Sequence, residues 1–363
     1  MLERVNRYKP VVAFHPGETL GEKLEELGMG PKEFALRTGK PEKTIIAVLK
    51  GKSSITPEMA VQFEHVLKIP AHFWLNMQCS YDEYLIRVER NEMLAESTEW
   101  ARSFPYADMV KKGWLAARSS IKEKTHELLS FFGFSDHKAW EEFYFNQQLK
   151  IAFRISLAHT QEPHAISAWL RKGELQASEI RANDYDEKLF KELLPVIKNL
   201  MAEQPPDFFI RLQAICLEAG VKVVHTPCIC KAPVNGCTRW INGSPVIQLS
   251  GRYKRNDSFW FSFFHEAGHI LLHGKKDIFI ENVDYTGKDD QKEKEADNFA
   301  IKWTLSEEQE KKILMLYEIS EEDVIDFAEE FNTHPAIIIG RLQHKGVIPY
   351  SLGREFIEPV VLE

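Results

Sequence analysis

Two histidines stand four residues apart in the segment FFHEAGHILLH, residues 263–273, and a glutamate directly follows the first of them. On a helix, residues i and i+4 lie on the same face, so His265 and His269 can present two imidazoles to one metal ion. Glu266 is offset by one position and would stand beside the ion, where a general base must be to take a proton from water. The pattern predicts a metal-dependent hydrolytic site.

A catalytic zinc ion takes three protein ligands and keeps one position open, so a third ligand must come from elsewhere. The segment EKEADNFA, residues 293–300, offers carboxylates at helical spacing. Glu293 and Asp297 share a helix face, and we expect Glu293 to bind one zinc ion per chain while Asp297 orients a histidine from behind. Glu295 is the competing ligand, although a regular helix turns it about 160° away from Asp297.

His273 lies four residues beyond His269 and shares its face. It is either a neighbour that supports the ligand from the second layer of the site or a capping histidine before Gly274. The pattern does not identify the group that would stabilise an oxyanion, for which Tyr285 and His273 are guesses. Phe264, Gly268, Leu271 and Leu272 make this helix apolar enough to be buried, so core histidines without a metal are the alternative.

The elements around this motif indicate a small mixed domain. A helix over residues 208–220 precedes a strand at 221–225 and a hairpin at 238–250, whose turn is Asn242-Gly243. A substrate peptide could pair with an edge strand around residues 246–249. A helix over about 291–303 and further helices follow, one capped by Ser320 and one with Pro335 just inside its start.

The first 90 residues carry dense helix signals. A helix is expected to start at Thr19 and stop at Gly28, the next has Pro31 in its first turn, and Gly39 follows its end. Thr56 and Pro57 form a strong start signal for a fourth helix after PEKTIIAVLKGK. With PAHFWLNMQ as a fifth, the segment predicts a compact domain of five short helices.

The second and third of these helices have the spacing of a helix-turn-helix, in which the second helix enters the major groove of DNA. Phe34, Ala35, Ile45 and Val48 would pack the pair together. Lys43 and Thr44 fall at the N-terminal end of the second helix, where base contacts arise, and Lys50 and Lys52 flank its end and could reach phosphates. Ile46 and Ala47 stand where polar side chains are expected, so a helix-turn-helix that contacts only protein is the alternative.

Residues 91–205 also show helical periodicity, and AEQPPD at 202–207 is the clearest break. We therefore expect a DNA-binding domain at 1–90, a helical connector at 91–205 and a metallopeptidase-like domain at 206–363. The fold class is mainly α with a small β-sheet. The connector could be a dimerisation platform, a rigid spacer or a ligand pocket.

Composition narrows the class of protein. The net charge is −8, but residues 1–80 hold 11 lysines and arginines against 9 acidic residues, which fits a small DNA-binding head on an acidic body. No apolar run approaches the roughly 20 residues of a membrane span, and the charged N-terminus does not look like a signal peptide, so we expect a cytoplasmic protein with no membrane partner.

The five cysteines are odd in number and unevenly placed, so a disulfide framework is not expected. His225, Cys228, Cys230 and Cys237 could hold a structural zinc, but the C-x-C spacing favours ordinary reduced cysteines. Cys79 and Cys216 are expected in the core.

HEAGHILLH followed by EKEADNFA resembles the ImmA/IrrE family of metallopeptidases over roughly residues 210–345. The resemblance implies a zinc-dependent endopeptidase whose known substrates are helix-turn-helix repressors. It implies His265, His269 and Glu293 as zinc ligands and Glu266 as the base. The chain departs from the family after FA, where IKWTLSEEQ lacks the Leu-Pro segment of many members.

The stretch over about 15–84, from HPGETLGEKL to FWLNMQCSYDEY, resembles the HigA-type antidotes among the XRE regulators. This resemblance implies binding to operator DNA as a homodimer. Together the two resemblances imply a transcriptional regulator that hydrolyses a peptide bond in a repressor or antitoxin-type protein. The competing hypotheses are a DNA-binding repressor or antitoxin whose metal domain only senses, and a pure interaction protein.

Overall fold

The computed structural model describes residues 13–146, 162–273, 279–280 and 288–362, and the chain divides into two compact units, Met1–Glu96 and Ser97–Glu363. Tyr285, one of the two residues considered for the oxyanion, lies outside the described residues. The mainly helical architecture with a small sheet confirms the expected fold class. The finer division at residues 90 and 205 stays a prediction.

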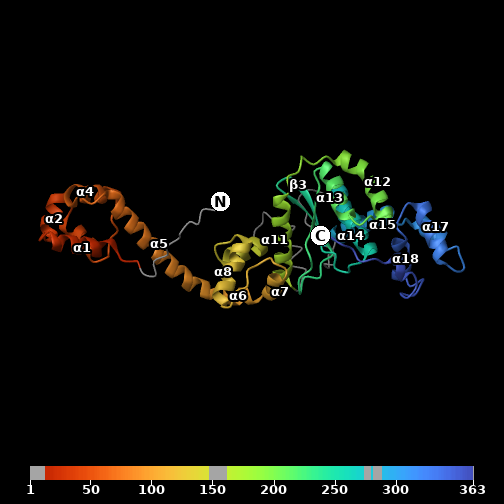
Figure 1. The fold of residues 1–363 in the computed structure, drawn as a ribbon, viewed down its shortest axis with the longest axis horizontal. Helices are drawn as coiled ribbons and strands as arrows, with labels where there is room; N and C mark the ends of the chain where they lie inside the picture. The colour runs from red at the N-terminus through yellow and green to blue at the C-terminus, as the bar shows by residue number, and fades with distance from the viewer. Residues whose placement is uncertain (1–12, 147–161, 274–278, 281–287, 363) are drawn as a thin grey trace. The chain divides into compact units, whose positions relative to one another are not determined.

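From residue 13 onward, where the structure describes it, the first unit consists of five helices (Figure 1). They are α1 (Pro16–Glu26), α2 (Pro31–Thr38), α3 (Glu42–Leu49), α4 (Pro57–Leu67) and α5 (Ala71–Glu96). The expected start of the first helix at Thr19 is wrong, because Pro16 occupies the first position and His15 caps it, its Nδ1 accepting from the backbone N–H of Gly17 at 2.9 Å. The cap of α4 by Thr56 is confirmed.

The core of this unit joins α2 and α3 as the helix-turn-helix spacing predicts. Phe34, Ala35, Ile45 and Val48 are all buried. The ring of Phe34 lies 4.9 Å from that of Phe63 on α4, centroid to centroid. Gly39 ends α2 in the left-handed conformation (φ 66°), which a glycine adopts without strain and which turns the chain sharply into α3.

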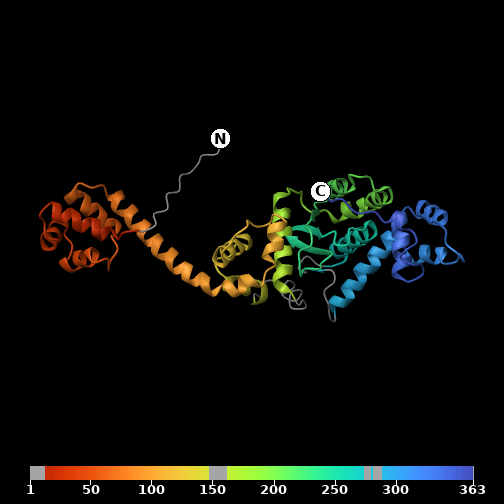
Figure 2. The same ribbon diagram turned by 60° about the horizontal axis from the view of Figure 1, so that its bottom comes forward.

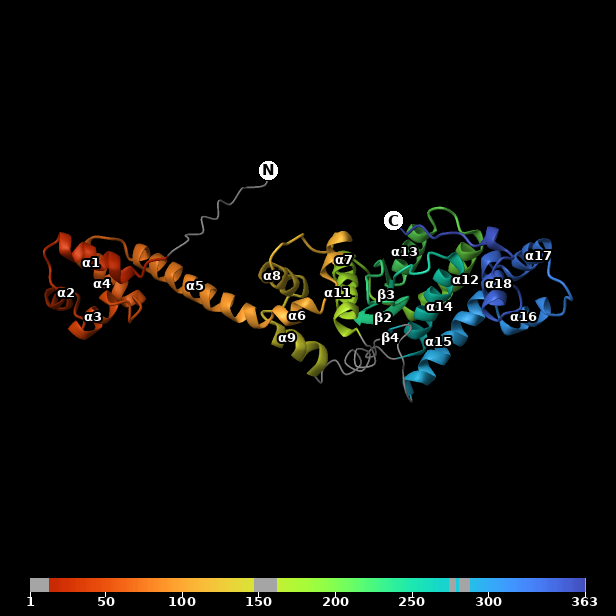
Figure 3. The same ribbon diagram turned by 90° about the horizontal axis from the view of Figure 1, so that it is seen from below.

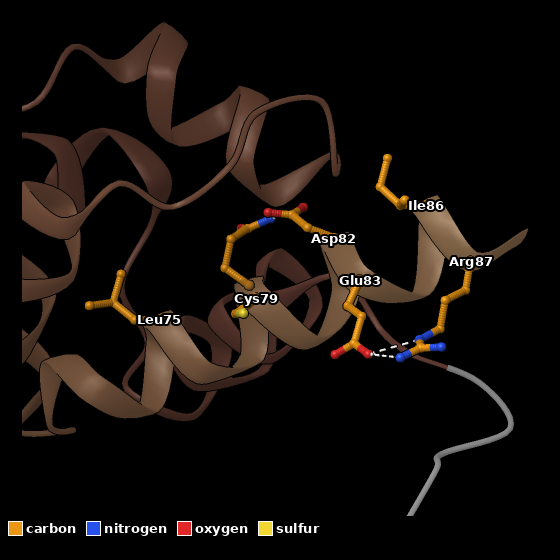
Figure 4. A pocket seen from close by; sticks show the side chains of 7 residues that line it. Leu75, Cys79, Asp82, Glu83, Ile86 and Arg87 are labelled. Atoms are coloured by element: carbon orange, nitrogen blue, oxygen red, sulfur yellow. Dashed lines mark hydrogen bonds and ion pairs between the residues drawn. The ribbon is translucent and has the colours of Figure 1, made fainter. Parts of the chain in front are cut away.

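The fifth helix differs from the short one expected, since α5 has 26 residues. Cys79 on α5 is exposed, so its placement in the core was wrong. Figure 4 shows it with Leu75, Asp82 and Ile86 along an open groove of about 620 Å³, and a Glu83–Arg87 ion pair lies at the side. Every residue that lines the groove comes from α5.

The second unit begins with helices and continues into a mixed α/β part. Before the sheet come α6 (Thr98–Arg102), α7 (Tyr106–Lys111), α8 (Ile121–Phe132), α9 (His137–Glu141), the π-helical turn η1 (Glu142–Asn146), α11 (Pro163–Glu179), α12 (Glu187–Glu203) and α13 (Phe208–Glu218). The sheet and the later helices comprise β1 (Lys222–His225), β2 (Gly236–Ile241), β3 (Ser244–Leu249), α14 (Asn256–Leu272), β4 (Phe279–Ile280), α15 (Lys288–Thr304), α16 (Glu307–Ile313), α17 (Glu321–Phe331), α18 (Pro335–His344) and the 3₁₀ turn η3 (Arg354–Phe356).

The strands are ordered β1-β3-β2-β4. The hairpin of β2 and β3 is confirmed, and its turn residues Asn242 and Gly243 both have positive φ (50° and 85°). The expectation of an edge strand at 246–249 is wrong. β3 pairs in parallel with β1 on one side and antiparallel with β2 on the other, so its backbone groups are already used by both neighbours.

Helices cover both faces of this sheet, with α11 on one face and α14 on the other in all three views (Figures 1, 2 and 3). Side chains alternate accordingly along β2 and β3. Ile247 joins the core with Phe263 and Phe264 of α14. Gln248 turns the other way and donates to the carbonyl of Trp169 in α11 at 2.8 Å. The helix α14 is thus held between the sheet and the helices beyond it.

The α14 and α15 helices pack closely side by side (Figure 3). Gly268 permits this contact, since a Cβ there would stand 3.1 Å from the Cβ of Phe299 on α15. The expected burial of the HEAGH helix holds for Phe264 and Gly268, whereas Leu272 is 50% exposed. None of the helices that the structure describes combines the length and the apolar character needed to cross a membrane.

Candidate metal centre

His265 and His269 lie on one face of α14, as their spacing requires. Their Nε2 atoms are 3.0 Å apart, and both side chains are almost completely buried. The helix α14 thus places both rings in the protein interior. Burial lowers the pKa of His269 to about 4, so this ring holds no proton charge near neutral pH.

Glu293 on α15 brings the third donor. One of its oxygens lies 3.2 Å from Nε2 of His265 and the other lies 3.5 Å from Nε2 of His269. Burial raises the pKa of Glu293, but the contacts with the two imidazoles outweigh this and lower it to about 2. In the part of the chain that the structure describes, these three residues are the group that could hold a metal ion.

The separations of these donor atoms fit a small divalent ion. Zinc binds nitrogen and oxygen at roughly 2.0–2.1 Å in a tetrahedral arrangement, which places ligand atoms about 3.3 Å from one another. The two Nε2 atoms are 3.0 Å apart, and they lie 3.2 and 3.5 Å from different oxygens of Glu293. One ligand atom of each residue lies within 4.8 Å of the others, so the three side chains are close enough to bind one ion. Oε1 of Glu293 is buried and accepts no hydrogen bond from the described residues, so it remains available to a cation.

A second layer of side chains holds both rings from behind. Nδ1 of His265 lies 2.9 Å from Oδ1 of Asp297, one turn further along α15 than Glu293. A carboxylate only accepts, so Nδ1 carries a proton and donates it, and Nε2 is the nitrogen that faces Glu293 and His269. The structure therefore places Asp297 where it fixes the tautomer that a metal ligand requires.

His269 is held by a longer chain of contacts. Its Nδ1 lies 2.9 Å from Nδ1 of His273, and Nε2 of His273 lies 3.2 Å from Oε2 of Glu295. Glu295 accepts from His273, so His273 accepts in turn from Nδ1–H of His269, and Nε2 of His269 faces Glu293 and His265. Glu295, the competing ligand in the sequence, thus stands behind the group rather than in it. His273 also ends α14 as its C-cap.

Glu266 directly follows His265 on α14, and its side chain is fully buried. A Cβ on Gly236, the first residue of β2, would come within 2.6 Å of Oε1 of Glu266, so only glycine leaves room for this carboxylate. Thr238 on the same strand donates its hydroxyl to the backbone carbonyl of Glu266 at 2.9 Å. Gly236 and Thr238 were not found from the sequence, because nothing local to a strand start signals what it packs against.

Among the described residues, His225, Cys228, Cys230 and Cys237 do not form a group of three or more possible metal ligands. Cys228 donates to the carbonyl of Val234, His225 contacts the carbonyl of Ser250 through Nε2, and the backbone N–H of Cys230 donates to Asp108. All five cysteines are free thiols. Cys216 is buried as expected.

The residues expected to contact DNA lie on and after α3 of the first unit. Lys43 is exposed and Thr44 is half-buried, both in the first turn of the helix. Lys50 caps the C-terminus of α3, and Lys52 follows it; both are exposed. The four side chains therefore stand at the two ends of α3, on a scaffold whose opposite face is buried against α2.

Known proteins match the two parts of the chain separately. Residues 216–343 match the family model described as the IrrE N-terminal-like domain, Peptidase_M78. The chain is 36% identical over 63 residues to the HTH-type transcriptional regulator YddM of Escherichia coli (strain K12), an alignment that covers 17% of this chain and 67% of YddM.

Two solved structures are similar to the N-terminal part. A HigA-family addiction module antidote protein from Coxiella burnetii is 30% identical, with 23% of this chain and 91% of that chain covered and a TM-score of 0.22. A Pseudomonas aeruginosa protein solved in complex with its operator DNA is 25% identical, with coverage of 22% and 87% and a TM-score of 0.22. By its identity to YddM and its match over residues 216–343, the chain belongs to the helix-turn-helix transcriptional regulators and carries an IrrE-like metallopeptidase domain with a His–His–Glu group that could hold a metal ion.

Proposed function

We propose that this chain is a transcriptional regulator whose second unit is a zinc-dependent endopeptidase. The observation that carries the proposal is the convergence of two buried imidazoles and one carboxylate within 3.5 Å of one another, with the buried Glu266 directly after His265 on the same helix. This donor set suits zinc in a catalytic site, since it supplies three protein ligands and leaves a coordination position for chemistry. In this proposal His265, His269 and Glu293 hold the ion.

A bound zinc ion would polarise the carbonyl of the scissile peptide bond and make a nearby water molecule more acidic. Glu266 accepts the proton of the attacking water and later delivers it to the departing amine nitrogen. Gly236 and Thr238 position Glu266 by leaving space for its carboxylate and by fixing its backbone. Asp297 and the His273–Glu295 pair keep both ligating rings in the required tautomer.

Three protein variants test the peptidase directly. Zinc content is measured for the full chain and for Glu293→Ala and Glu295→Ala, together with cleavage of candidate proteins by Glu266→Gln. We expect about one zinc per chain, lost in Glu293→Ala and retained in Glu295→Ala. Glu266→Gln should keep zinc and lose cleavage by a factor of roughly 10² or more. A Glu266→Gln protein that binds zinc and cleaves at the wild-type rate would contradict the mechanism.

We further propose that the first unit binds operator DNA as a homodimer in the cytoplasm, where its target lies. Support comes from the exposed Lys43, Lys50 and Lys52 around α3, which can neutralise phosphates. Light scattering would give the mass of the free protein and of its DNA complex. A monomer in both states would rule out the dimer, and binding that is insensitive to salt would argue against contacts to the DNA backbone.

The substrate we propose is a repressor or antitoxin-type protein with a helix-turn-helix, in line with the resemblance of the second unit to ImmA/IrrE proteins. Purified helix-turn-helix regulators can be incubated with the zinc-loaded chain and with Glu266→Gln, and the fragments identified by mass spectrometry. If zinc is bound and operator binding is normal but no substrate is cut, the second unit acts as a non-hydrolytic sensor instead.

A further inference from the structure

A cavity of about 530 Å³ lies in the second unit between α14 and α18. Ser258, Phe261 and Ser262 of α14 line one side of it. These positions precede His265 by seven, four and three residues, so they share the face of α14 that carries the metal group. Figure 3 shows α14 with α15 and α18 beside it.

The cavity stands within reach of a peptide bound at the metal group. The ring of Phe261 lies 6.5 Å from that of His265, centroid to centroid. An extended peptide advances roughly 3.3 Å per residue. A substrate whose scissile bond lies at the three-residue group would therefore place the side chain of a nearby residue, one or two positions away, at this cavity.

Among the charged groups that line the cavity, Arg341 has a guanidinium that the described residues use only in part. Arg255 and Asp257 neutralise each other through two hydrogen bonds of 2.9 and 2.8 Å. Within the described part of the chain, Arg341 on α18 pairs with the buried carboxylate of Glu310, with Nε 3.8 Å from its oxygen, and Glu310 is also paired with Lys345. Nη2 of Arg341 is buried and has no hydrogen-bond partner among the described residues.

Arg341 lines the cavity with part of its side chain exposed, and a guanidinium binds carboxylates through several N–H donors in fixed geometry. Phe261 and Ile337 give the same cavity apolar walls, which suit the methylene groups of an acidic side chain. The two exposed hydroxyphenyl groups of Tyr253 and Tyr350 also line it. The cavity wall thus combines apolar side chains with one cationic side chain, that of Arg341.

We propose that this cavity is the subsite that receives an acidic side chain of the substrate, Asp or Glu, close to the scissile bond, and that Arg341 determines this specificity. The inference rests on the proposed peptidase function, whose substrate class it names. A C-terminal carboxylate offers the same chemistry, and the test separates the two sources.

The test measures binding before cleavage. The zinc-loaded full chain with Glu266→Gln is titrated with fluorescent, acetylated and amidated peptides that carry one Glu, with the same peptides carrying Gln, and with Gln peptides that end in a free carboxylate. We expect at least one Glu position to bind about tenfold more tightly than its Gln counterpart, the scale of one charge-assisted hydrogen bond. In the Arg341→Gln background this preference should disappear.

A pair of variants at Ser258 tests the same cavity independently, in case Arg341→Gln does not fold. Ser258 lies in the first turn of α14, where an acidic residue is well tolerated, so Ser258→Asp should fold and repel a carboxylate from the cavity. Ser258→Asn is its neutral match and should keep the preference for Glu. Lys311→Gln, a change of equal charge on α16 that does not line the cavity, should keep it too.

The possible results distinguish the acidic subsite, a site for a chain terminus and the peptidase function itself. Equal binding of Glu and Gln peptides, or a preference that survives both Arg341→Gln and Ser258→Asp, would overturn the subsite. Tight binding of the Gln peptides with a free carboxylate would assign the cavity to a chain terminus instead. A clear preference for Glu in the Glu266→Gln protein, with no cleavage of the same peptides by the wild type, would leave the subsite standing and remove the peptidase function.

Discussion

Oδ1 of Asp297 lies 2.9 Å from Nδ1 of His265, while Glu293, four residues earlier on the same helix, lies 3.2 Å from Nε2 of that ring. One turn of α15 therefore holds both edges of a single imidazole. In the proposed metal centre the two carboxylates have different tasks, since Glu293 would bind the ion and Asp297 accepts the proton of the opposite nitrogen.

This relationship predicts different losses for the two carboxylates. Glu293→Ala should abolish zinc binding, whereas Asp297→Asn should weaken it by about 10–100-fold, the usual effect of removing a group that supports a ligand. Competition with a chelator of known affinity measures both. Asp290→Asn is the matched control, because Asp290 is also on α15 but pairs with Lys294. Equal losses for Asp297→Asn and Glu293→Ala would show that Asp297 is itself a ligand.

The close contact between Gly236 and the carboxylate of Glu266 gives a second prediction. Its replacement by alanine places a Cβ 2.6 Å from Oε1 of Glu266, so the carboxylate must move away from its present position. We expect zinc content to stay unchanged, cleavage to fall at least about tenfold, and the free energy of unfolding to fall by roughly 1–3 kcal/mol, as for other overpacked sites. Denaturant unfolding and a cleavage assay measure these effects.

The matched control is Gly21→Ala in α1, where the added Cβ would meet its nearest neighbour, a methyl group of Leu49, at an ordinary 3.8 Å. Alanine there should be neutral or slightly stabilising, because it replaces glycine inside a helix. If Gly236→Ala cleaves as fast as the wild type, Glu266 does not need the position that β2 leaves for it.

Burial of His269 predicts a pH dependence of stability in the metal-free protein. An unfolded histidine takes up its proton near pH 6.5, whereas burial lowers the pKa of folded His269 to about 4. The unfolded state therefore binds more protons between these values, and the free energy of unfolding should decrease as the pH falls from 7 to 5. The linkage relation puts the contribution of this one residue on the order of 2 kcal/mol.

Urea unfolding at pH 7 and pH 5, after removal of metal with a chelator, gives the difference. The same measurement on His269→Asn should show a smaller decrease, because asparagine does not titrate. A variant that loses as much stability as the wild type over this interval would show that other groups cause the pH dependence.

The parts of this fold that the sequence predicted are those with local causes. Pro31 and Gly39 bound α2, and Asn242-Gly243 forms the turn of the hairpin, because each residue type has a backbone preference that needs no distant partner. The spacing of His265 and His269 likewise determines a shared face once the segment is helical.

The parts that were wrong or missed depend on distant contacts. The hairpin pattern implies that β3 pairs with β2, but not that β1 joins on its other side in parallel, so β3 was taken for an edge strand. Gly236 is 30 positions before Glu266, and nothing in its neighbourhood reveals the contact. Glu295 stands behind His273 because of how α15 crosses α14, which helical spacing alone does not determine.

The two ends of α3 should contribute differently to DNA binding. Lys43→Ala and Thr44→Ala remove groups from the first turn, where base contacts arise, and each should relax sequence preference at a cost of about 1–3 kcal/mol. Lys50→Ala and Lys52→Ala should weaken binding to all sequences alike and lower the slope of log K against log salt by about 0.9 each, because each lysine releases one counterion.

A selected operator and a scrambled duplex, titrated at several salt concentrations by fluorescence anisotropy, separate the two effects. Lys302→Ala, which removes one lysine from α15 in the second unit, is the matched control and should leave both affinities unchanged. Since Glu266 belongs to the second unit, Glu266→Gln should also bind the operator normally. If all four α3 variants keep the wild-type affinity and salt slope, the helix-turn-helix serves protein contact, and the few polar side chains around Ile46 and Ala47 would explain why.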